Sequence, residues 1–237
     1  MALSSTQQLL NLNLVPEYTF ANFYSDDPVL LALLKNTAGN QYNEPQVVIW
    51  GPPGSGKTHL LQATCQTALK EQQRAIYLPI AECLQYDPSC FEDLHTMDLV
   101  CLDDLHLISK QSIWERAVFD LINQLRASHT RLVIASEKIL NEDLFQLADL
   151  TSRSVWGPVF KLDSLKEADL IRAIELQAQT RGLVLSQELV LYMLTHYPRD
   201  MRNLVTIMQK LSQASLREQR KITCLLYTSP SPRDRIA

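Results

Sequence analysis

The stretch QVVIWGPPGSGKTHLL, residues 46–61, decides the fold, because it joins an apolar run to a glycine-rich loop and the start of a helix. Gly51, Gly56, Lys57 and Thr58 match the P-loop pattern at the strand-to-helix junction that it requires. In such a loop, backbone N–H groups bind phosphate oxygens, the lysine reaches the β- and γ-phosphates, and the threonine hydroxyl binds Mg²⁺. The stretch therefore predicts a site for ADP or ATP with Mg²⁺. The other predicted binding positions are Pro52, Pro53, Gly54, Ser55 and His59.

A second motif, LVCLDDL, is an apolar strand that ends in Asp103 and Asp104. The carboxyl ends of parallel strands meet at one edge of a sheet, so we expect Asp103 beside the phosphates, holding Mg²⁺ through water. Asp104 is expected to position or activate an attacking water. The strand RLVIAS ends in Ser136 and is followed by Glu137, and we expect a polar residue here, between the other two strands, to lie near the γ-phosphate or that water. A simple helix cap is the alternative role for Ser136.

The order of the predicted elements indicates an α/β fold followed by a helical domain. Continuous apolar strands alternate with helices as far as Leu162, which predicts a parallel sheet covered on both faces. The strands then stop, and three amphipathic helices follow. We expect four parts: a flexible leader at 1–16, an α/β domain at 17–163, a small α-helical domain at 164–223, and a disordered or non-native tail at 224–237.

Composition limits the classes of function. The 237 residues carry a net charge of −4, which gives no general attraction to nucleic acid and argues against a direct DNA binder. Five cysteines without metal-ligand spacing fit a reduced, cytoplasmic protein. We expect neither a membrane span nor a signal peptide. The cysteines are Cys65, Cys83, Cys90, Cys101 and Cys224.

Together these motifs resemble the AAA+ ATPases, and finer matches point to the bacterial initiator DnaA and its relatives. YTFANFY, residues 18–24, is similar to a segment that lies beside the adenine in that family. LTSRSVWGPVFKLDSL resembles the stretch with the arginine finger, which implies Arg153 as a catalytic group acting in trans. PRDMRNLV resembles the lid motif whose arginine senses nucleotide, which implies Arg199, with Arg202 as the alternative. By position alone, Arg153 is equally a surface arginine at a helix C-terminus.

Over residues 7–223 the chain resembles the short Hda branch of that family, the regulatory inactivators of DnaA. The resemblance implies hydrolysis of DnaA-bound ATP with the help of the DNA-loaded sliding clamp, the β subunit of DNA polymerase III, which prevents re-initiation of replication. QQLLNL is similar to a clamp-binding peptide, which implies Gln7, Leu10 and Leu12 as contacts. Without the resemblance, packing or disorder explains this leader. The resemblance also implies DNA contact only through the clamp, and a homodimer.

The phosphate loop departs from the Hda pattern, because it is complete where Hda proteins commonly have a degenerate one. We therefore expect nucleotide binding, and we expect the chain to stimulate a partner's ATPase more than to turn over ATP quickly itself. Two other functions stay open. One is a helicase-loader ATPase of the DnaC type, and the other is a non-enzymatic DnaA-like adaptor that tethers partners.

Overall fold

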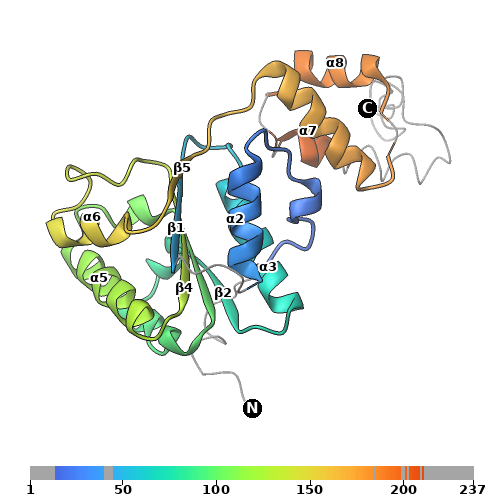
Figure 1. The fold of residues 1–237 in the computed structure, drawn as a ribbon. Coiled ribbons are helices and arrows are strands. Elements are labelled where there is room, and N and C mark those ends of the chain that lie inside the picture. The colour runs from blue at the N-terminus through green and yellow to red at the C-terminus, as the bar shows by residue number, and fades with distance from the viewer. Residues whose placement is uncertain are drawn as a thin grey trace, which may run out of the picture. The chain divides into compact units, whose positions relative to one another are not determined.

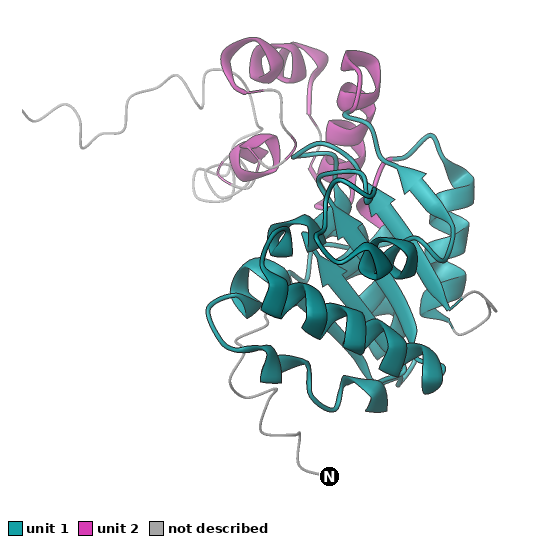
Figure 2. Ribbon diagram, turned by 90° about the vertical axis from the view of Figure 1, so that its left-hand side faces the viewer, with its two compact units in different colours: residues 1–20, 25–164 teal, residues 21–24, 165–237 magenta. Residues whose placement is uncertain are grey.

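The computed structural model of the chain divides into two compact units (Figure 1). Figure 2 colours the first unit, residues 1–20 and 25–164, apart from the second, residues 21–24 and 165–237. The structure describes residues 14–39, 45–183, 185–198, and 201–210 apart from 202 and 209.

A five-stranded parallel sheet forms the centre of the first unit (Figure 1). Its strand order is β2-β3-β4-β1-β5, and all four pairings are parallel. Strand β4 lies between β3 and β1, as the sequence predicts, so the loop after β1 and the acids after β3 share one sheet edge. The predicted α/β fold is confirmed. The strands are β1 (Gln46–Trp50), β2 (Ala75–Pro79), β3 (Leu99–Asp103), β4 (Arg131–Ser136) and β5 (Val159–Lys161).

Helices cover both faces of this sheet. Helices α2 (Pro28–Ala38) and α3 (Lys57–Lys70) lie on one side, and α5 (Ser112–Ala127) and α6 (Ala148–Ser154) lie on the other (Figure 1). Every residue of β3 and β4 is buried, which explains why these strands are apolar runs without alternation. The sequence did not predict the short elements η1 (Phe20–Asn22), α4 (Ile80–Cys83), η2 (Pro88–Phe91), η3 (Leu94–Thr96) and η4 (Leu105–Ile108).

Helix α2 begins with a capping aspartate and a proline in its first turn. The side chain of Asp27 accepts hydrogen bonds from the backbone N–H groups of Val29 and Leu30, both at 3.0 Å. Pro28 occupies the first turn, where a missing N–H costs nothing. The acid and the proline together fix the first residue of this helix.

The second unit is a small helical domain, and the predicted lid-like part is confirmed. Helices α7 (Glu167–Gln179) and α8 (Gln187–His196) pack around a cluster that includes Ile174, Met193 and Leu204. Residues 21–24 belong to this unit: the side-chain amide of Gln177 donates to the carbonyl of Asn22 at 2.7 Å. The segment before the P-loop is therefore divided, with residues up to Phe20 in the first unit.

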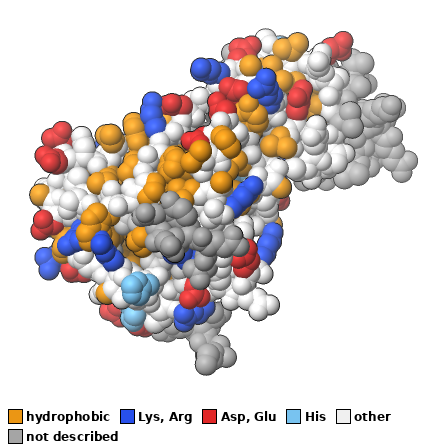
Figure 3. All heavy atoms as spheres, in the orientation of Figure 1, with side chains coloured by type: hydrophobic (Ala, Val, Ile, Leu, Met, Phe, Trp, Pro, Cys, Tyr) orange, Lys and Arg blue, Asp and Glu red, His pale blue; other side chains and the backbone are white. Residues whose placement is uncertain are grey.

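The outer side of α2 and the free edge of the sheet share one apolar surface (Figure 3). Val29 is 65% exposed there, and a shallow groove of about 490 Å³ runs between α2 and the residues Pro158 and Phe160 at the sheet edge. None of the helices in the described ranges combines the length and apolar character that a membrane crossing demands.

Candidate functional site

The loop between β1 and α3 is held from both sides by backbone contacts. Gly51 donates its N–H to the carbonyl of Ser136 at 3.1 Å, and Leu162 donates to the carbonyl of Trp50 at 2.7 Å. A Cβ atom on Gly51 would lie 2.0 Å from the carbonyl oxygen of Leu162, so only glycine fits. Gly54 and Gly56 have φ angles of 77° and 99°, which glycine adopts without strain. The backbone thus curls into the shape that a phosphate needs.

Lys57 starts α3, and its ammonium group lies inside this loop. Its Nζ donates to the carbonyl oxygens of Gly51 at 2.7 Å and Pro52 at 2.8 Å. Burial lowers the pKa of Lys57, and attraction to Asp104 and Asp103 opposes that shift. The lysine is therefore a nearly enclosed cation poised beside the loop, held by neutral oxygens that a phosphate can replace.

Asp103 ends β3 as a buried carboxylate with several hydrogen-bond donors. Tyr77 donates its hydroxyl at 2.8 Å, the backbone N–H of Asp104 donates at 3.0 Å, and the hydroxyl of Thr58 is a third partner. Burial raises the pKa of Asp103, repulsion from Asp104 adds to the shift, and these donors oppose it. The structure therefore brings the P-loop threonine and the strand acid into direct contact.

The next residue, Asp104, turns the chain away from the strand. Its φ of 58° is left-handed, and it begins η4 as a half-buried side chain. His106 lies on the same turn: its Nδ1 accepts the N–H of Glu137 at 3.1 Å, and its Nε2 is 3.6 Å from a carboxylate oxygen of Glu137. Burial lowers the pKa of His106, whereas attraction to Asp104 and Glu137 opposes that shift. His106 and Glu137 therefore lie near Asp104, at the carboxyl edge of the sheet.

Ser136 is fully buried, and its hydroxyl is used within its own turn. The Oγ donates to the carbonyl of Lys138 at 2.6 Å and accepts the N–H of Lys138 at 3.2 Å. The exposed polar side chain at the end of β4 is Glu137 rather than Ser136. The hydroxyl therefore closes a turn, and the roles of Ser136 as a nucleotide contact or as a helix cap stay predictions.

The segment before α2 packs along the first turns of α3. The rings of Tyr18 and His59 stack with centroids 4.8 Å apart, and His59 Nε2 is 2.8 Å from the carbonyl of Thr19. Two glutamines of α3, Gln62 and Gln66, bond to the backbone of Val15. The Tyr18–His59 pair adjoins the P-loop helix, and the predicted place of the adenine beside this segment, which the family resemblance implies, stays a prediction.

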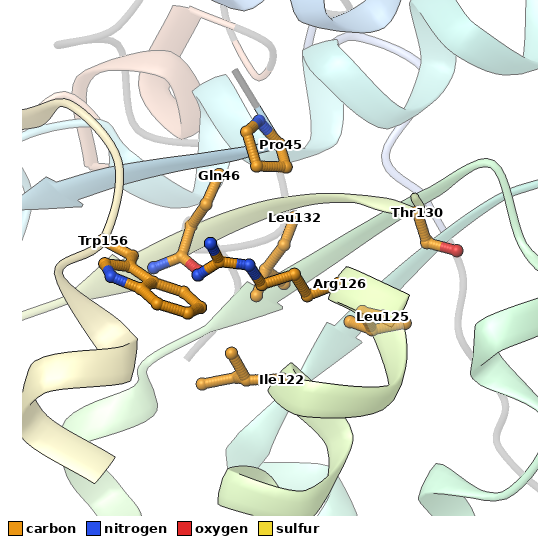
Figure 4. Close-up of a pocket in the computed structure, with 8 residues that line it drawn as sticks. All are labelled: Pro45, Gln46, Ile122, Leu125, Arg126, Thr130, Leu132 and Trp156. Atoms are coloured by element: carbon orange, nitrogen blue, oxygen red, sulfur yellow. The ribbon is translucent and has the colours of Figure 1, made fainter. Parts of the chain in front are cut away.

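Arg153 occupies the last turn of α6, and its carbonyl is bonded to Gln46 at the amino end of β1, the end opposite the phosphate loop. It is half-buried, and its guanidinium carbon lies 4.2 Å from the centre of the Trp156 ring, which is itself 46% exposed. Arg126 of α5 contacts the same ring. Figure 4 shows Arg126, Gln46 and Trp156 pointing toward one another around a cavity of about 180 Å³. None of the ion pairs formed by the described residues includes Arg153.

Several predicted site residues lie outside the described residues. These are Gln7, Leu10 and Leu12 of the leader, and Arg199 and Arg202 of the lid motif. Their roles stay predictions. The tail at 224–237 also lies outside the described part of the chain.

The residues that the structure brings together fit a nucleotide with Mg²⁺. Positive-φ glycines, an enclosed lysine and the Thr58–Asp103 contact supply the cradle, the cation and the oxygen ligands respectively. Within the described ranges, no group of three His, Cys, Asp or Glu residues is placed to hold a metal alone. Thr58 and Asp103 would therefore hold Mg²⁺ together with phosphate oxygens.

Sequence reasoning missed His106, Tyr77 and Gln46. His106 follows the acid pair by two positions, but no motif singles it out, and Tyr77 reaches Asp103 from the neighbouring strand. Gln46 is the polar first residue of an otherwise apolar strand, and this position was the only sequence feature that could have indicated a buried contact for its side chain.

Comparison with known families divides the chain as the fold does. The family described as "Bacterial DnaA ATPAse domain" matches residues 14–161, and the family described as "Hda, lid domain" matches residues 167–225. An uncharacterized protein of Haemophilus influenzae is 38% identical over 217 residues, covering 90% of this chain and 93% of that protein.

Solved structures share the fold. Domain III of the Thermotoga maritima replication initiation protein DnaA has a TM-score of 0.75 at 22% identity, over 89% of this chain and 94% of that one. AMPPCP-bound DnaA from Aquifex aeolicus has a TM-score of 0.71 at 22% identity, over 87% and 71% of the two chains.

Proposed function

Because this chain belongs to the family of bacterial DnaA ATPase domains and carries an Hda lid, we propose that it is a regulatory inactivator of the replication initiator DnaA. In this proposal the chain docks on the DNA-loaded sliding clamp and presents Arg153 to ATP bound by DnaA. Hydrolysis leaves ADP-bound DnaA, which cannot start another round of replication. The proposed place of action is the cytoplasm.

The observation that carries the proposal is the state of Arg153. Its guanidinium is half-exposed, rests on an exposed indole, and takes part in none of the carboxylate pairs among the described residues. A guanidinium in this state is free to bind the charge that develops on a transferring phosphoryl group. An arginine locked into a buried ion pair would lack that freedom.

The chain's own nucleotide has a different role in this proposal. Membership of the family implies nucleotide binding, and Lys57, Thr58 and Asp103 are the residues proposed to hold ADP or ATP with Mg²⁺. The bound nucleotide fixes the shape and assembly of the chain, including the proposed homodimer, while the hydrolysed nucleotide belongs to DnaA. Bound Mg²⁺ would supply charge neutralisation at the phosphates.

The experiment measures ADP formation on ATP-bound DnaA with clamp, DNA and this protein. The wild type is expected to accelerate hydrolysis, and Arg153→Ala to remove most of the acceleration, by at most about 10³–10⁵-fold on the scale of arginine fingers supplied in trans. Arg74→Ala is the matched control, because Arg74 is an exposed arginine paired with Asp98 at 2.8 Å. Full acceleration by Arg153→Ala contradicts the proposal.

Clamp docking needs its own measurement. We expect Gln7→Ala to lose retention on immobilised sliding clamp, while Gln8→Ala, the neighbouring glutamine, keeps it. Retention of the Gln7 variant at the wild-type level removes the clamp from the proposal and leaves a clamp-independent adaptor.

A second candidate, a helicase-loader ATPase, is favoured by one observation. Lys57, Thr58, Asp103 and Asp104 meet at one edge of the sheet, and this set is sufficient in type for turnover in cis. Rapid ATP hydrolysis by the chain alone, stimulated by single-stranded DNA, is the outcome that selects the loader.

A further inference from the structure

Arg153 lies at the end of a helix that its own sequence barely supports. Helix α6 has seven residues, and so short a helix is marginal without tertiary contacts. Its last carbonyl groups have no partner within the helix. The placement of Arg153 therefore depends on whatever binds those carbonyls.

One side chain binds two of them. The Nε2 atom of Gln46 donates to the carbonyl of Arg153 at 3.0 Å and to the carbonyl of Ser154 at 2.7 Å. An amide nitrogen carries two hydrogens, so both donors are used. In the sequence, Gln46 is 107 residues from Arg153 and 108 residues from Ser154.

The environment of Gln46 explains why an amide stands there. Gln46 is 5% exposed, and the next three strand residues, Val47, Val48 and Ile49, are fully buried. A polar group in such a position costs free energy unless it is hydrogen-bonded. The two carbonyls of α6 supply the bonds that offset this cost, which ties the strand to the helix end.

The backbone of the following loop closes on the same residue. A Cβ atom on Gly157 would lie 1.8 Å from the carbonyl oxygen of Gln46, so the two backbones are in contact. Between these attachments stands Trp156, whose ring is contacted by the guanidinium group of Arg126 (Figure 4) and by that of Arg153. The backbone of Arg153 is thus fixed from the strand, and its side chain rests on the indole.

We propose that Gln46 is a positioning residue for Arg153: its amide caps α6 and sets the point on the surface from which the guanidinium reaches a partner's nucleotide. The inference rests on the proposed function. It adds that β1 carries the phosphate loop at one end and the support of the finger at the other. About 17 Å of strand separates Gln46 from Gly51 at 3.3 Å per residue.

The test uses the full chain with clamp, DNA and ATP-bound DnaA. Gln46→Met keeps the length of the side chain and removes both donors. We expect maximal stimulation of hydrolysis to fall about tenfold, the equivalent of one to two net hydrogen bonds. The concentration for half-maximal stimulation and the chain's own affinity for ADP are expected to stay within about twofold, the scatter of variants outside such contacts.

A matched control and a second variant separate positioning from folding. Gln111→Met removes an amide that donates to the carbonyl of Leu107 at 2.8 Å, away from Arg153 and from the phosphate loop, and it is expected to stimulate like the wild type. Gln46→Glu places a carboxylate against two carbonyl oxygens, which repel it. Once protonated, the acid regains one donor, so its stimulation relative to wild type is expected to rise about fivefold between pH 8 and pH 6.

The outcomes divide cleanly. A folded Gln46→Met protein with wild-type maximal stimulation overturns the inference, and so does a loss that only follows the fraction unfolded with no recovery of Gln46→Glu at low pH. If Arg153→Ala also stimulates fully, the proposed function itself fails. If Arg153→Ala is inactive while Gln46→Met is active, only the positioning role fails.

Discussion

Strand β1 ends in two different kinds of structure. Its carboxyl end leads into the phosphate loop, where Gly51 packs against the carbonyl of Leu162. Its amino end holds α6 through Gln46, where Gly157 packs against the carbonyl of Gln46. Both ends are therefore pinned by a glycine against a backbone oxygen. The first end is a sequence motif, whereas the second is assembled from segments about a hundred residues apart.

Only one of these two ends can be recognised from the sequence. A phosphate loop is local, because its donors, lysine and hydroxyl follow one another along the chain. The support proposed for Arg153 is not local, because it links a short helix to the first strand of the sheet. If the two ends of β1 are equally rigid and functionally separate, substitutions at one end should leave the role of the other unchanged.

The largest effect is expected from adding one carbon at either end. Gly51→Ala and Gly157→Ala each place a Cβ atom within 2.0 Å of a carbonyl oxygen, so the backbone must shift. We expect each to lower the free energy of unfolding by about 3 kcal/mol. Urea denaturation of both variants measures this.

A third glycine provides the control for these two. Gly182 has a φ of 69° and open space around the added carbon, so Gly182→Ala carries strain without a clash and is expected to cost about 1 kcal/mol. Equal losses in the free energy of unfolding at all three positions, or no loss for Gly157→Ala, would show that the amino end of β1 is less rigid than the contact between Gly157 and Gln46 implies.

The next effect separates the two ends. Lys57→Met removes the ammonium that bonds to Gly51 and Pro52, and we expect the chain's affinity for ADP to fall about 10–100-fold, the worth of a charged hydrogen bond. Saturating ADP is expected to restore stimulation of ATP hydrolysis by DnaA, because Gln46 and Arg153 are unchanged in this variant. Titration with a fluorescent nucleotide measures the affinity.

Lys70→Met is the control, since Lys70 is an exposed lysine at the far end of the same helix. A loss of stimulation that saturating ADP leaves unchanged would show that Lys57 acts at both ends of β1.

Most of the sheet and the nucleotide edge could be predicted from the sequence, because their signals are short-range. Apolar runs gave β1, β3 and β4, and the motif placed Lys57. Helix α6 was expected only in the alternative that puts Arg153 at a helix C-terminus. Its bounds could not be predicted, because seven residues carry too little periodicity, and it forms through contacts with α5 and Gln46. The turn at Ser136 could not be predicted, because a hydroxyl at a strand end bonds its own backbone as readily as a ligand.

A smaller effect is expected from the buried carboxylate of Asp103, which lies at the same edge of the sheet as the phosphate loop. Burial raises the pKa of Asp103, so the folded state binds its proton more tightly than the unfolded state does. This contribution is present below the unfolded pKa of about 3.9, and it is lost as pH rises through the folded pKa. Asp103→Asn is therefore expected to be more stable than wild type at neutral pH. The gain is about 1.4 kcal/mol for each tenfold difference in proton affinity between the folded and unfolded states. The variant is also expected to bind Mg²⁺-nucleotide poorly.

The pH dependence makes this prediction specific to a raised pKa. The stability difference between Asp103→Asn and wild type, from urea denaturation without nucleotide, is expected to grow between pH 4 and pH 8. A difference that shrinks over this range would mean that the donors Tyr77 and Thr58 outweigh burial, and that the edge holds its acid ionised.

The smallest effect tests the finger end. The Oγ of Ser154 is buried and finds no hydrogen-bond partner among the described residues, while the carbonyl of the same residue accepts from Gln46. Ser154→Ala removes an unsatisfied hydroxyl and leaves that backbone bond intact, so we expect a gain of about 1 kcal/mol, or roughly 2–4 °C in melting temperature. Stimulation of DnaA hydrolysis is expected to stay unchanged, because Arg153 keeps its support. A destabilised Ser154→Ala protein would indicate that the hydroxyl does bind a group at this corner, and that Gln46 shares the task of holding α6.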